Sequence, residues 1–200
     1  MKNLILGATG NLAQQFINIY DQDKEIVLFV RDKKRLQSQN NHYSVIEGDM
    51  YDYKTIIPAL EDADIVLSFV GSSPMPLFAN NLLKAIQESN SNVKRILWLG
   101  AAGANKETIG REGSFWKTMP EYFGQQKDAI DIIINSQIPY TIINPAMFNT
   151  KKEQKAIITQ SDTQVAEVQS VSRQTVARVF NNSLINNQYI NQQITVGDSY

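Results

Sequence analysis

Short apolar segments alternate along the chain with segments whose apolar residues recur at helical spacing. Residues 3–6 form the first apolar segment, a glycine follows, and Leu12, Phe16 and Ile19 then recur at intervals of three and four. This pattern is typical of a strand, a tight turn and an amphipathic helix. The next apolar segment, residues 26–30, is continuous rather than alternating, as expected for a parallel strand covered on both faces. We therefore predict that these two strands lie side by side.

The alternation of strands and helices extends over the rest of the chain. Further strands are predicted near residues 44–47, 65–70, 96–99, 140–143, 156–159 and 193–196. Helices are predicted at about 51–60, after Pro74 and Pro76, at about 121–136, and after Ser172, a suitable N-cap. Residues 100–120 contain four glycines and little periodicity, so we expect a loop there. The chain is therefore predicted to be a single α/β domain with a doubly wound, mostly parallel sheet and helices on both faces.

Composition and charge narrow the class of protein. The 200 residues suit one domain, and 19 Lys and Arg against 20 Asp and Glu leave a net charge of −1, which gives no basic surface for nucleic acid. Cysteine is absent and His42 is the only histidine, so no metal site is expected. No apolar run approaches the ~20 residues that a membrane helix requires. We expect a cytoplasmic protein, a monomer or homodimer, that binds a small molecule and neither nucleic acid nor membrane.

The glycine-rich segment after the first strand is the clearest candidate site. Gly7 fits a sharp turn from strand to helix, Gly10 lets a pyrophosphate approach the backbone, and Ala13 fits close packing of helix on sheet. The N–H groups and dipole at the start of the helix favour a phosphate. The predicted phosphate-binding residues are Gly7, Ala8, Thr9, Gly10, Asn11 and Leu12. The sequence thus predicts a single Rossmann-type NAD(P)-binding domain over residues 1–200, with a small substrate-side portion from about 145 to 200.

Charges after the second strand bear on the choice of cofactor. An NADP site needs a cation for the 2′-phosphate, whereas an NAD site normally presents a carboxylate to the ribose. Arg31 directly follows the apolar run, and Lys34 or Arg35 lies one turn further on, so NADP(H) is predicted as the preferred cofactor. Asp32 leaves NAD(H) open. The alternative is that Asp32 caps a solvated helix on which the cations are surface groups.

Two residues after the third strand are further candidates for the cofactor site. Asp49 is a possible acceptor for the adenine amino group, and Met50 lies next to it. The alternative for Asp49 is a helix cap or an acidic turn.

A set of motifs in fixed order runs through the chain. They are GATGNLA at 7–13, Arg31, the pair Gly48 and Asp49, DADIVLSFVG at 62–71, KRILWLGAAG at 94–103, IPYTIINPA at 138–146 and VSRQTVA at 171–177. On this pattern the whole chain resembles the atypical short-chain dehydrogenase/reductase superfamily, particularly its NmrA-like and biliverdin-reductase-B-like branches of NAD(P)H-binding proteins. The resemblance implies one set of residues along the cofactor, Phe69, Val70, Gly71 and Ser72, and another beside the nicotinamide, Pro145, Ala146 and Met147. Asn144 stands where family members often carry arginine.

The catalytic pattern of the superfamily is incomplete in this chain. Its carbonyl chemistry commonly uses a Tyr-x-x-x-Lys pair, in which tyrosine donates the proton, and a serine after the fifth strand. Lys127 lies on the expected helix, but Phe123 stands four residues before it, and residues 100–103 contain no serine. Tyr122 is about 100° around the helix from Phe123, so it could substitute only in a rotated register. Lys127 and Tyr122 remain the catalytic candidates, and an exposed helix lysine is the alternative for Lys127.

Aromatic residues in the loop before this helix suggest the type of substrate. Phe115 and Trp116, with Met147, are candidates to contact a flat apolar acceptor beside the nicotinamide. The alternative is that the aromatic residues anchor the loop to the core. Because the cofactor supplies the hydride, we predict an NADPH-dependent oxidoreductase for a small planar acceptor such as a flavin or quinone. The alternative is a regulatory protein that senses NADP(H) without turnover.

Overall fold

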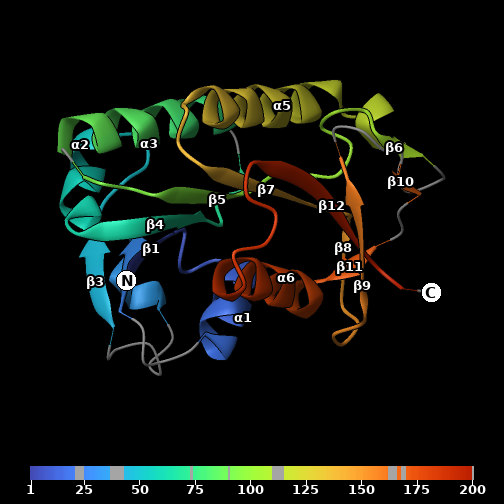
Figure 1. Ribbon diagram of the computed structural model, residues 1–200, viewed down its shortest axis with the longest axis horizontal. Helices are drawn as coiled ribbons and strands as arrows, with labels where there is room; N and C mark the ends of the chain where they lie inside the picture. The colour runs from blue at the N-terminus through green and yellow to red at the C-terminus, as the bar shows by residue number, and fades with distance from the viewer. Residues whose placement is uncertain are drawn as a thin grey trace.

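A central sheet organises the part of the chain that the computed structural model describes, residues 1–20, 25–36, 43–72, 74–89, 91–109, 115–161, 166–167 and 170–199. The sheet has eight strands in the order β3-β2-β1-β4-β5-β7-β12-β9 (Figure 1). Their bounds are β1 (Lys2–Leu6), β2 (Ile26–Val30), β3 (Ser44–Glu47), β4 (Ala63–Ser68), β5 (Arg95–Leu99), β7 (Tyr140–Pro145), β9 (Ala156–Gln160) and β12 (Gln192–Asp198). Neighbouring strands are parallel except for β12 and β9. The predicted single-domain, doubly wound, mostly parallel fold is confirmed.

Helices cover both faces of the sheet (Figure 1). The described helices are α1 (Asn11–Ile19), α2 (Tyr53–Ile56), α3 (Met75–Ser89), α5 (Pro120–Asn135) and α6 (Arg173–Ile185), with 3-10 turns η1 (Lys33–Arg35), η3 (Ile57–Leu60) and η4 (Phe115–Lys117). In Figure 1, α2, α3 and α5 lie above the sheet, and α1 and α6 lie below it. Two short strand pairs, β6 (Thr108–Ile109) with β10 (Ala166–Glu167) and β8 (Phe148–Asn149) with β11 (Val171–Ser172), lie outside the main sheet.

Two apolar cores result from this layering, one on each face. Along β1, Leu4 and Leu6 belong to the core with α3 and α5, whereas Ile5 belongs to the core with α1 and α6. Successive side chains of a strand point to opposite faces, so a strand buried on both faces needs apolar residues at every position. This is why the first two strands are continuous rather than alternating apolar runs.

The predicted elements differ from the observed ones at a few places. The strand predicted near 156–159 is β9, but it is the antiparallel edge strand. The helix predicted at 51–60 is divided into α2 and η3, because Pro58 lacks the N–H that would continue the helical ladder. The strand predicted at 65–70 ends at Ser68, so Phe69 and Val70 lie beyond it. Ser172 is the N-cap of α6, as predicted, and its hydroxyl accepts the N–H of Thr175 at 3.0 Å.

A buried arginine at the start of β5 binds the carboxyl end of α6. Arg95, at the start of β5, is only 4% exposed, and its guanidinium donates to the carbonyl oxygens of Ser183 (3.1 Å) and Gln188 and to the hydroxyl of Thr141 (2.6 Å). Burial lowers the pKa of Arg95. A cation near the carboxyl end of a helix is favoured by the helix dipole. Arg95 therefore fixes α6 against the sheet.

We expect Arg95→Met to destabilise the protein strongly. The substitution removes the hydrogen bonds of a buried guanidinium to Ser183, Gln188 and Thr141, and the expected loss in the free energy of unfolding is about 2–4 kcal/mol. The control is Lys94→Gln, which removes the neighbouring, exposed cation that pairs with Asp64 and should cost less than about 1 kcal/mol. Urea denaturation measures both values. Equal stability of the two variants would contradict the role of Arg95.

Candidate functional site

The turn after β1 has the geometry that a bound pyrophosphate requires. Gly7 has a φ of +73°, and a Cβ there would lie 3.2 Å from the side chain of Val70. The N–H of Gly10 donates to the carbonyl of Gly7 at 2.9 Å, and the buried Gln14 side chain donates to the carbonyl of Ala8. Only glycine adopts this φ without strain while leaving the backbone open to a ligand. The turn is therefore held in place by hydrogen bonds within the protein, and its other side faces a cavity that a ligand could enter.

The amino end of α1 faces this turn. Gly10 caps α1 without a side-chain hydrogen bond, and the first turn of the helix contains no acidic residue. Its N–H groups and the positive end of the helix dipole therefore favour an anion. Ala8 and Leu12 are buried and Asn11 is exposed. Of the predicted loop residues, Gly7, Thr9 and Gly10 line the adjoining cavity.

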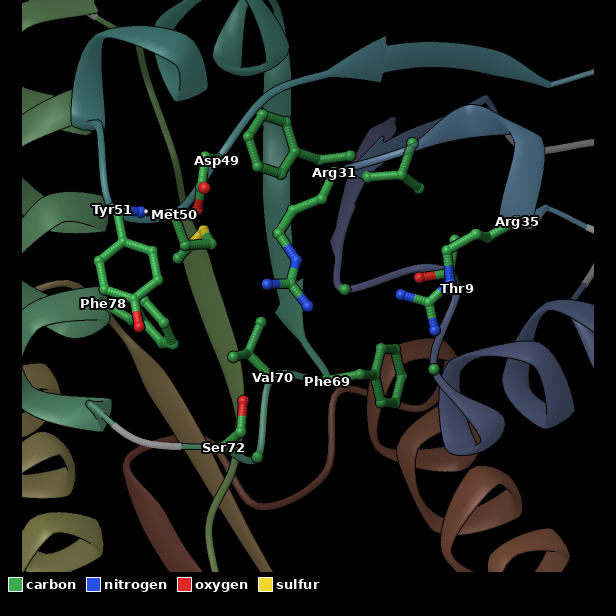
Figure 2. Close-up of a pocket in the computed structure, with 15 residues that line it drawn as sticks. Thr9, Arg31, Arg35, Asp49, Met50, Tyr51, Phe69, Val70, Ser72 and Phe78 are labelled. Carbon is green, nitrogen blue, oxygen red and sulfur yellow. Dashed lines mark hydrogen bonds between the residues drawn. The ribbon is translucent and has the colours of Figure 1, made fainter.

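A cavity of about 270 Å³, which we call the adenosine-side cavity, lies over the carboxyl ends of β1, β2 and β4 (Figure 2). Its lining residues are Gly7, Thr9, Gly10, Phe29, Val30, Arg31, Arg35, Asp49, Met50, Tyr51, Phe69, Val70, Gly71, Ser72 and Phe78. Ligands of open α/β sheets bind at such carboxyl ends. The predicted candidates Arg31, Asp49, Met50, Phe69 and Val70 thus lie together around one space.

Two arginines reach this cavity. Figure 2 shows the Arg31 side chain extending between Met50 and Val70, and the Arg35 guanidinium lying near Thr9. Neither arginine forms an ion pair with a carboxylate of the described residues. Both guanidinium groups are therefore available to an anionic ligand.

The neighbouring charges of this segment are used differently. The carboxylate of Asp32 accepts the N–H of Lys34 at 2.9 Å and caps η1. Lys34 is exposed and does not line the cavity, whereas Arg35 does. The helix-cap alternative for Asp32 is thus what the structure shows, and the second cation in the cavity is Arg35.

Three aromatic residues of the cavity, Phe29, Tyr51 and Phe78, were missed as site residues from the sequence. Tyr51 and Phe78 are in edge-to-face contact, with ring centroids 5.2 Å apart, beside the carboxylate of Asp49. That carboxylate also accepts the N–H of Tyr51 at 3.1 Å. Tyr51 could have been noticed because it lies two residues after Asp49, but Phe78 comes from α3 and only folding places it here. Together they offer a carboxylate and an aromatic surface to a planar base.

A second cavity of about 290 Å³, which we call the nicotinamide-side cavity, adjoins the first and shares Gly71 with it. Its lining residues are Gly71, Leu99, Gly100, Ala101, Ala102, Phe115, Met119, Tyr122, Phe123, Pro145, Ala146, Met147 and Phe148. Side chains that are mainly apolar and aromatic surround it, which suits a flat apolar ligand. The predicted residues Phe115, Pro145, Ala146 and Met147 meet here, but Trp116 does not line this cavity.

The catalytic candidates are divided between different surroundings. Tyr122 lines the nicotinamide-side cavity in edge-to-face contact with Phe123, at a centroid distance of 5.1 Å. Burial raises the pKa of Tyr122, an effect that the Gln126 side chain partly offsets. Lys127 does not line this cavity, and its ammonium pairs with Asp131 one turn further along α5. The structure therefore does not bring Tyr122 and Lys127 together as an acid and its partner.

Asn144, which stands in the place of the family arginine, belongs to the core. It is fully buried, and its amide donates to the hydroxyl of Ser161 at 3.3 Å. Its Oδ1 lies so close to Gly100 that a Cβ there would come within 2.1 Å. Asn144 therefore packs behind the cavity wall and leaves no room for a side chain at position 100.

A buried carboxylate holds the loop that follows β5. Glu107 is 7% exposed and accepts the N–H groups of Gly103 (2.9 Å) and Asn105 (3.1 Å) and the hydroxyl of Thr195 (3.0 Å). Gly103 has a φ of +100°, a conformation that favours glycine. The loop is thereby attached to β12, and its residues 101 and 102 are held along the nicotinamide-side cavity.

Among the described residues there is neither a metal-binding cluster nor a membrane-spanning helix. No group of three or more His, Asp and Glu side chains gathers within this part of the chain, and His42 lies outside it. No helix within the described ranges has the length and hydropathy to cross a bilayer.

Comparison with known proteins identifies the family. The model of the NAD(P)H-binding family matches residues 7–187. A search of curated proteins finds no significant match.

Solved structures show the same fold. A short-chain dehydrogenase/reductase from Veillonella parvula in complex with NADP has a TM-score of 0.86 at 21% identity, covering 98% of this chain and 94% of its own. An anaerobillin reductase from Escherichia coli O157:H7 has a TM-score of 0.83 at 15% identity, covering 99% and 97%. A putative NADH-flavin reductase from Streptococcus pneumoniae has a TM-score of 0.77 at 17% identity, covering 100% of both chains. The predicted Rossmann-type fold is confirmed, and one of these similar structures is itself a short-chain dehydrogenase/reductase. Since the family model spans nearly the whole sequence, the chain belongs to the NAD(P)H-binding family.

Proposed function

We propose that the protein is an NADPH-dependent oxidoreductase that reduces a small planar acceptor such as a flavin or quinone. The observation that carries this proposal is the pair of cavities that meet at Gly71. One cavity carries two arginines and the other is mainly apolar. Their arrangement along the carboxyl ends of the strands suits the two chemically different ends of a dinucleotide.

The chain's residues fit the cofactor because the glycine turn leaves room that a Cβ would fill. In this proposal Gly7, Thr9 and Gly10 contact the pyrophosphate, and the amino end of α1 faces its charge. Arg31 and Arg35 bind the 2′-phosphate, which gives the preference for NADP(H) over NAD(H). A bound dinucleotide supplies the hydride.

The adenine lies beside Asp49 in this arrangement, with Met50, Tyr51 and Phe78 as its apolar surroundings. The nicotinamide lies beside Pro145 and Ala146, at the entrance to the second cavity. Val70 and Gly71 line the passage between the two ends.

The nicotinamide-side cavity favours a reaction that needs no proton donor from the protein. Phe115, Met119 and Tyr122 surround the space in which an acceptor would lie against the nicotinamide, and such side chains stack on planar rings. Phe123 has no acidic proton to donate, and Lys127 pairs with Asp131. Flavins and quinones accept a hydride and take the accompanying proton from water, so the protein's contribution is to bind, orient and shield the two partners.

Similar structures support this class of acceptor. Two of them are named as an anaerobillin reductase and a putative NADH-flavin reductase, and a third contains NADP.

A second candidate is a regulatory protein of the NmrA-like type that senses NADP(H). The separation of Lys127 from the nicotinamide-side cavity favours it. It predicts tight NADPH binding with no oxidation of NADPH by any acceptor, so the turnover assay below separates the two functions.

Substitutions in the glycine turn separate backbone strain from ligand contact. Gly7→Ala should lower the free energy of unfolding by about 1–2 kcal/mol, because alanine is strained at positive φ. Gly10 has a φ of −73°, so Gly10→Ala meets no strain in φ. Its cost to the free protein comes from weaker capping of α1 and a 3.2 Å approach to the carbonyl of Gly7, and should stay within about 1 kcal/mol. Its methyl group would stand where the pyrophosphate approaches, and the stabilisation of about 2.7 kcal/mol expected with NADPH at 100 times its Kd should be lost. Thermal denaturation with and without NADPH measures both effects. Undiminished NADPH stabilisation of Gly10→Ala would contradict this placement.

The arginines set the cofactor preference. We expect the double variant Arg31→Gln and Arg35→Gln to bind NADPH at least about tenfold more weakly, because two charge-assisted contacts to the 2′-phosphate are lost. Affinity for NADH, which lacks that phosphate, should change little. The control is Lys33→Gln, an exposed cation of the same turn that does not line the cavity. Fluorescence titration with both nucleotides measures the change, and an equal loss for NADH would count against this assignment.

Turnover tests the reaction and the role of Tyr122. Wild-type protein should accelerate NADPH oxidation by riboflavin or a quinone. Tyr122→Phe should retain kcat within about threefold, whereas loss of a true general acid typically costs 10²–10⁴-fold. Steady-state absorbance of NADPH measures both. No acceleration with any flavin or quinone would refute the oxidoreductase, and a hundredfold loss in Tyr122→Phe would instead make Tyr122 the proton donor.

A further inference from the structure

A third cavity, of about 560 Å³, lies on the other side of Phe123 from the nicotinamide-side cavity. We call it the lysine cavity. Its lining residues are Gly103, Ala104, Lys106, Trp116, Lys117, Pro120, Phe123, Gly124, Lys127 and Asp128. Phe123 lines both cavities, so the two adjoin at this residue.

Neighbouring residues of the same loops line the two cavities. In and next to η4, Phe115 and Met119 line the nicotinamide-side cavity, whereas Trp116 and Lys117 line the lysine cavity. The loop after β5 is divided in the same way, because residues 101 and 102 face the first and residues 103 and 104 the second. A ligand that bridges the two cavities would therefore contact one continuous surface.

The charge of the lysine cavity is predominantly positive. Lys106, Lys117 and Lys127 line it, against the single carboxylate of Asp128. Lys127 is paired with Asp131, but Lys106 and Lys117 form no ion pair with a carboxylate of the described residues. Two ammonium groups without a counter-charge among these residues, close to a cavity, favour an anion.

Both lysines are directed by a fixed indole. The ammonium of Lys106 lies 5.9 Å and that of Lys117 5.3 Å from the ring of Trp116, a range in which cations are attracted to aromatic faces. Trp116 is held by its own N–H, which donates to the carbonyl of Thr108 at 3.2 Å, and by its contact with Gly103. Trp116, which was expected beside the nicotinamide, thus lines this cavity instead.

We propose that the lysine cavity binds an anionic arm of the acceptor, a phosphate or carboxylate, while the acceptor's ring occupies the nicotinamide-side cavity. This inference rests on the proposed function, and it narrows the substrate class to planar acceptors with an acidic side arm. Lys106 and Lys117 bind the charge, and Trp116 packs against the arm.

Flavin mononucleotide and riboflavin test the proposal, because they share one ring system and differ by a terminal phosphate. With NADP⁺ present to occupy the arginines of the first cavity, calorimetry should show flavin mononucleotide bound roughly tenfold more tightly than riboflavin. The double variant Lys106→Gln and Lys117→Gln should lose this preference and leave riboflavin binding unchanged. Lys106→Arg with Lys117→Arg should retain it, and raising the salt concentration should weaken it.

The control is Lys151→Gln with Lys152→Gln, which makes the same change in net charge at two exposed lysines that line neither cavity. It should retain the preference for flavin mononucleotide. Equal binding of the two flavins by wild type, no binding of either, or a preference that survives the loss of Lys106 and Lys117 would overturn the proposal.

Parallel turnover measurements separate this inference from the proposed function. Riboflavin reduction without any phosphate preference would leave the oxidoreductase standing and remove the anion site. Lysine-dependent binding of flavin mononucleotide without NADPH oxidation would support the anion site and remove the proposed reaction.

Discussion

Burial of a parallel sheet on both faces is the constraint on which the rest of this molecule depends. Each central strand carries apolar side chains to two cores, so helices must cover both sides. Parallel strands joined by helices also end at the same edge of the sheet. The carboxyl ends of all the parallel strands therefore lie at one edge of the sheet. The loops that follow these strands meet at that edge, and the candidate site is formed there.

At that edge the backbone, more than any side chain, prepares the binding of a dinucleotide. Gly7 turns the chain with positive φ against Val70, and the amino end of α1, which has no side-chain cap, faces the resulting space. In the proposed arrangement N–H groups bind the phosphates, and the charged residues Arg31 and Arg35, which line the same cavity, select between cofactors.

Buried polar groups hold the loops around this edge at fixed positions. Glu107 binds two N–H groups of the loop after β5 and a hydroxyl of β12. Asp198 does the same for the start of α6, accepting the N–H of Ser172 and the hydroxyl of Thr175. Each carboxylate has several donors, as a buried charge requires. The mainly apolar nicotinamide-side cavity is thus lined by loops that are attached to β12.

The sequence by itself determined the order of strands and helices, the glycine turn and the arginine after β2, because each depends on local periodicity or on a short stretch of chain. It also showed that Phe123 interrupts the usual catalytic pair. Tertiary structure decided what depends on direction and on distant partners. It placed Arg35 rather than Lys34 in the cavity, brought Phe78 beside Tyr51, turned Trp116 and Lys127 toward a separate cavity and made β9 antiparallel. A side chain's position on a loop fixes neither the cavity that it faces nor the charge with which it pairs, since both depend on residues far along the chain.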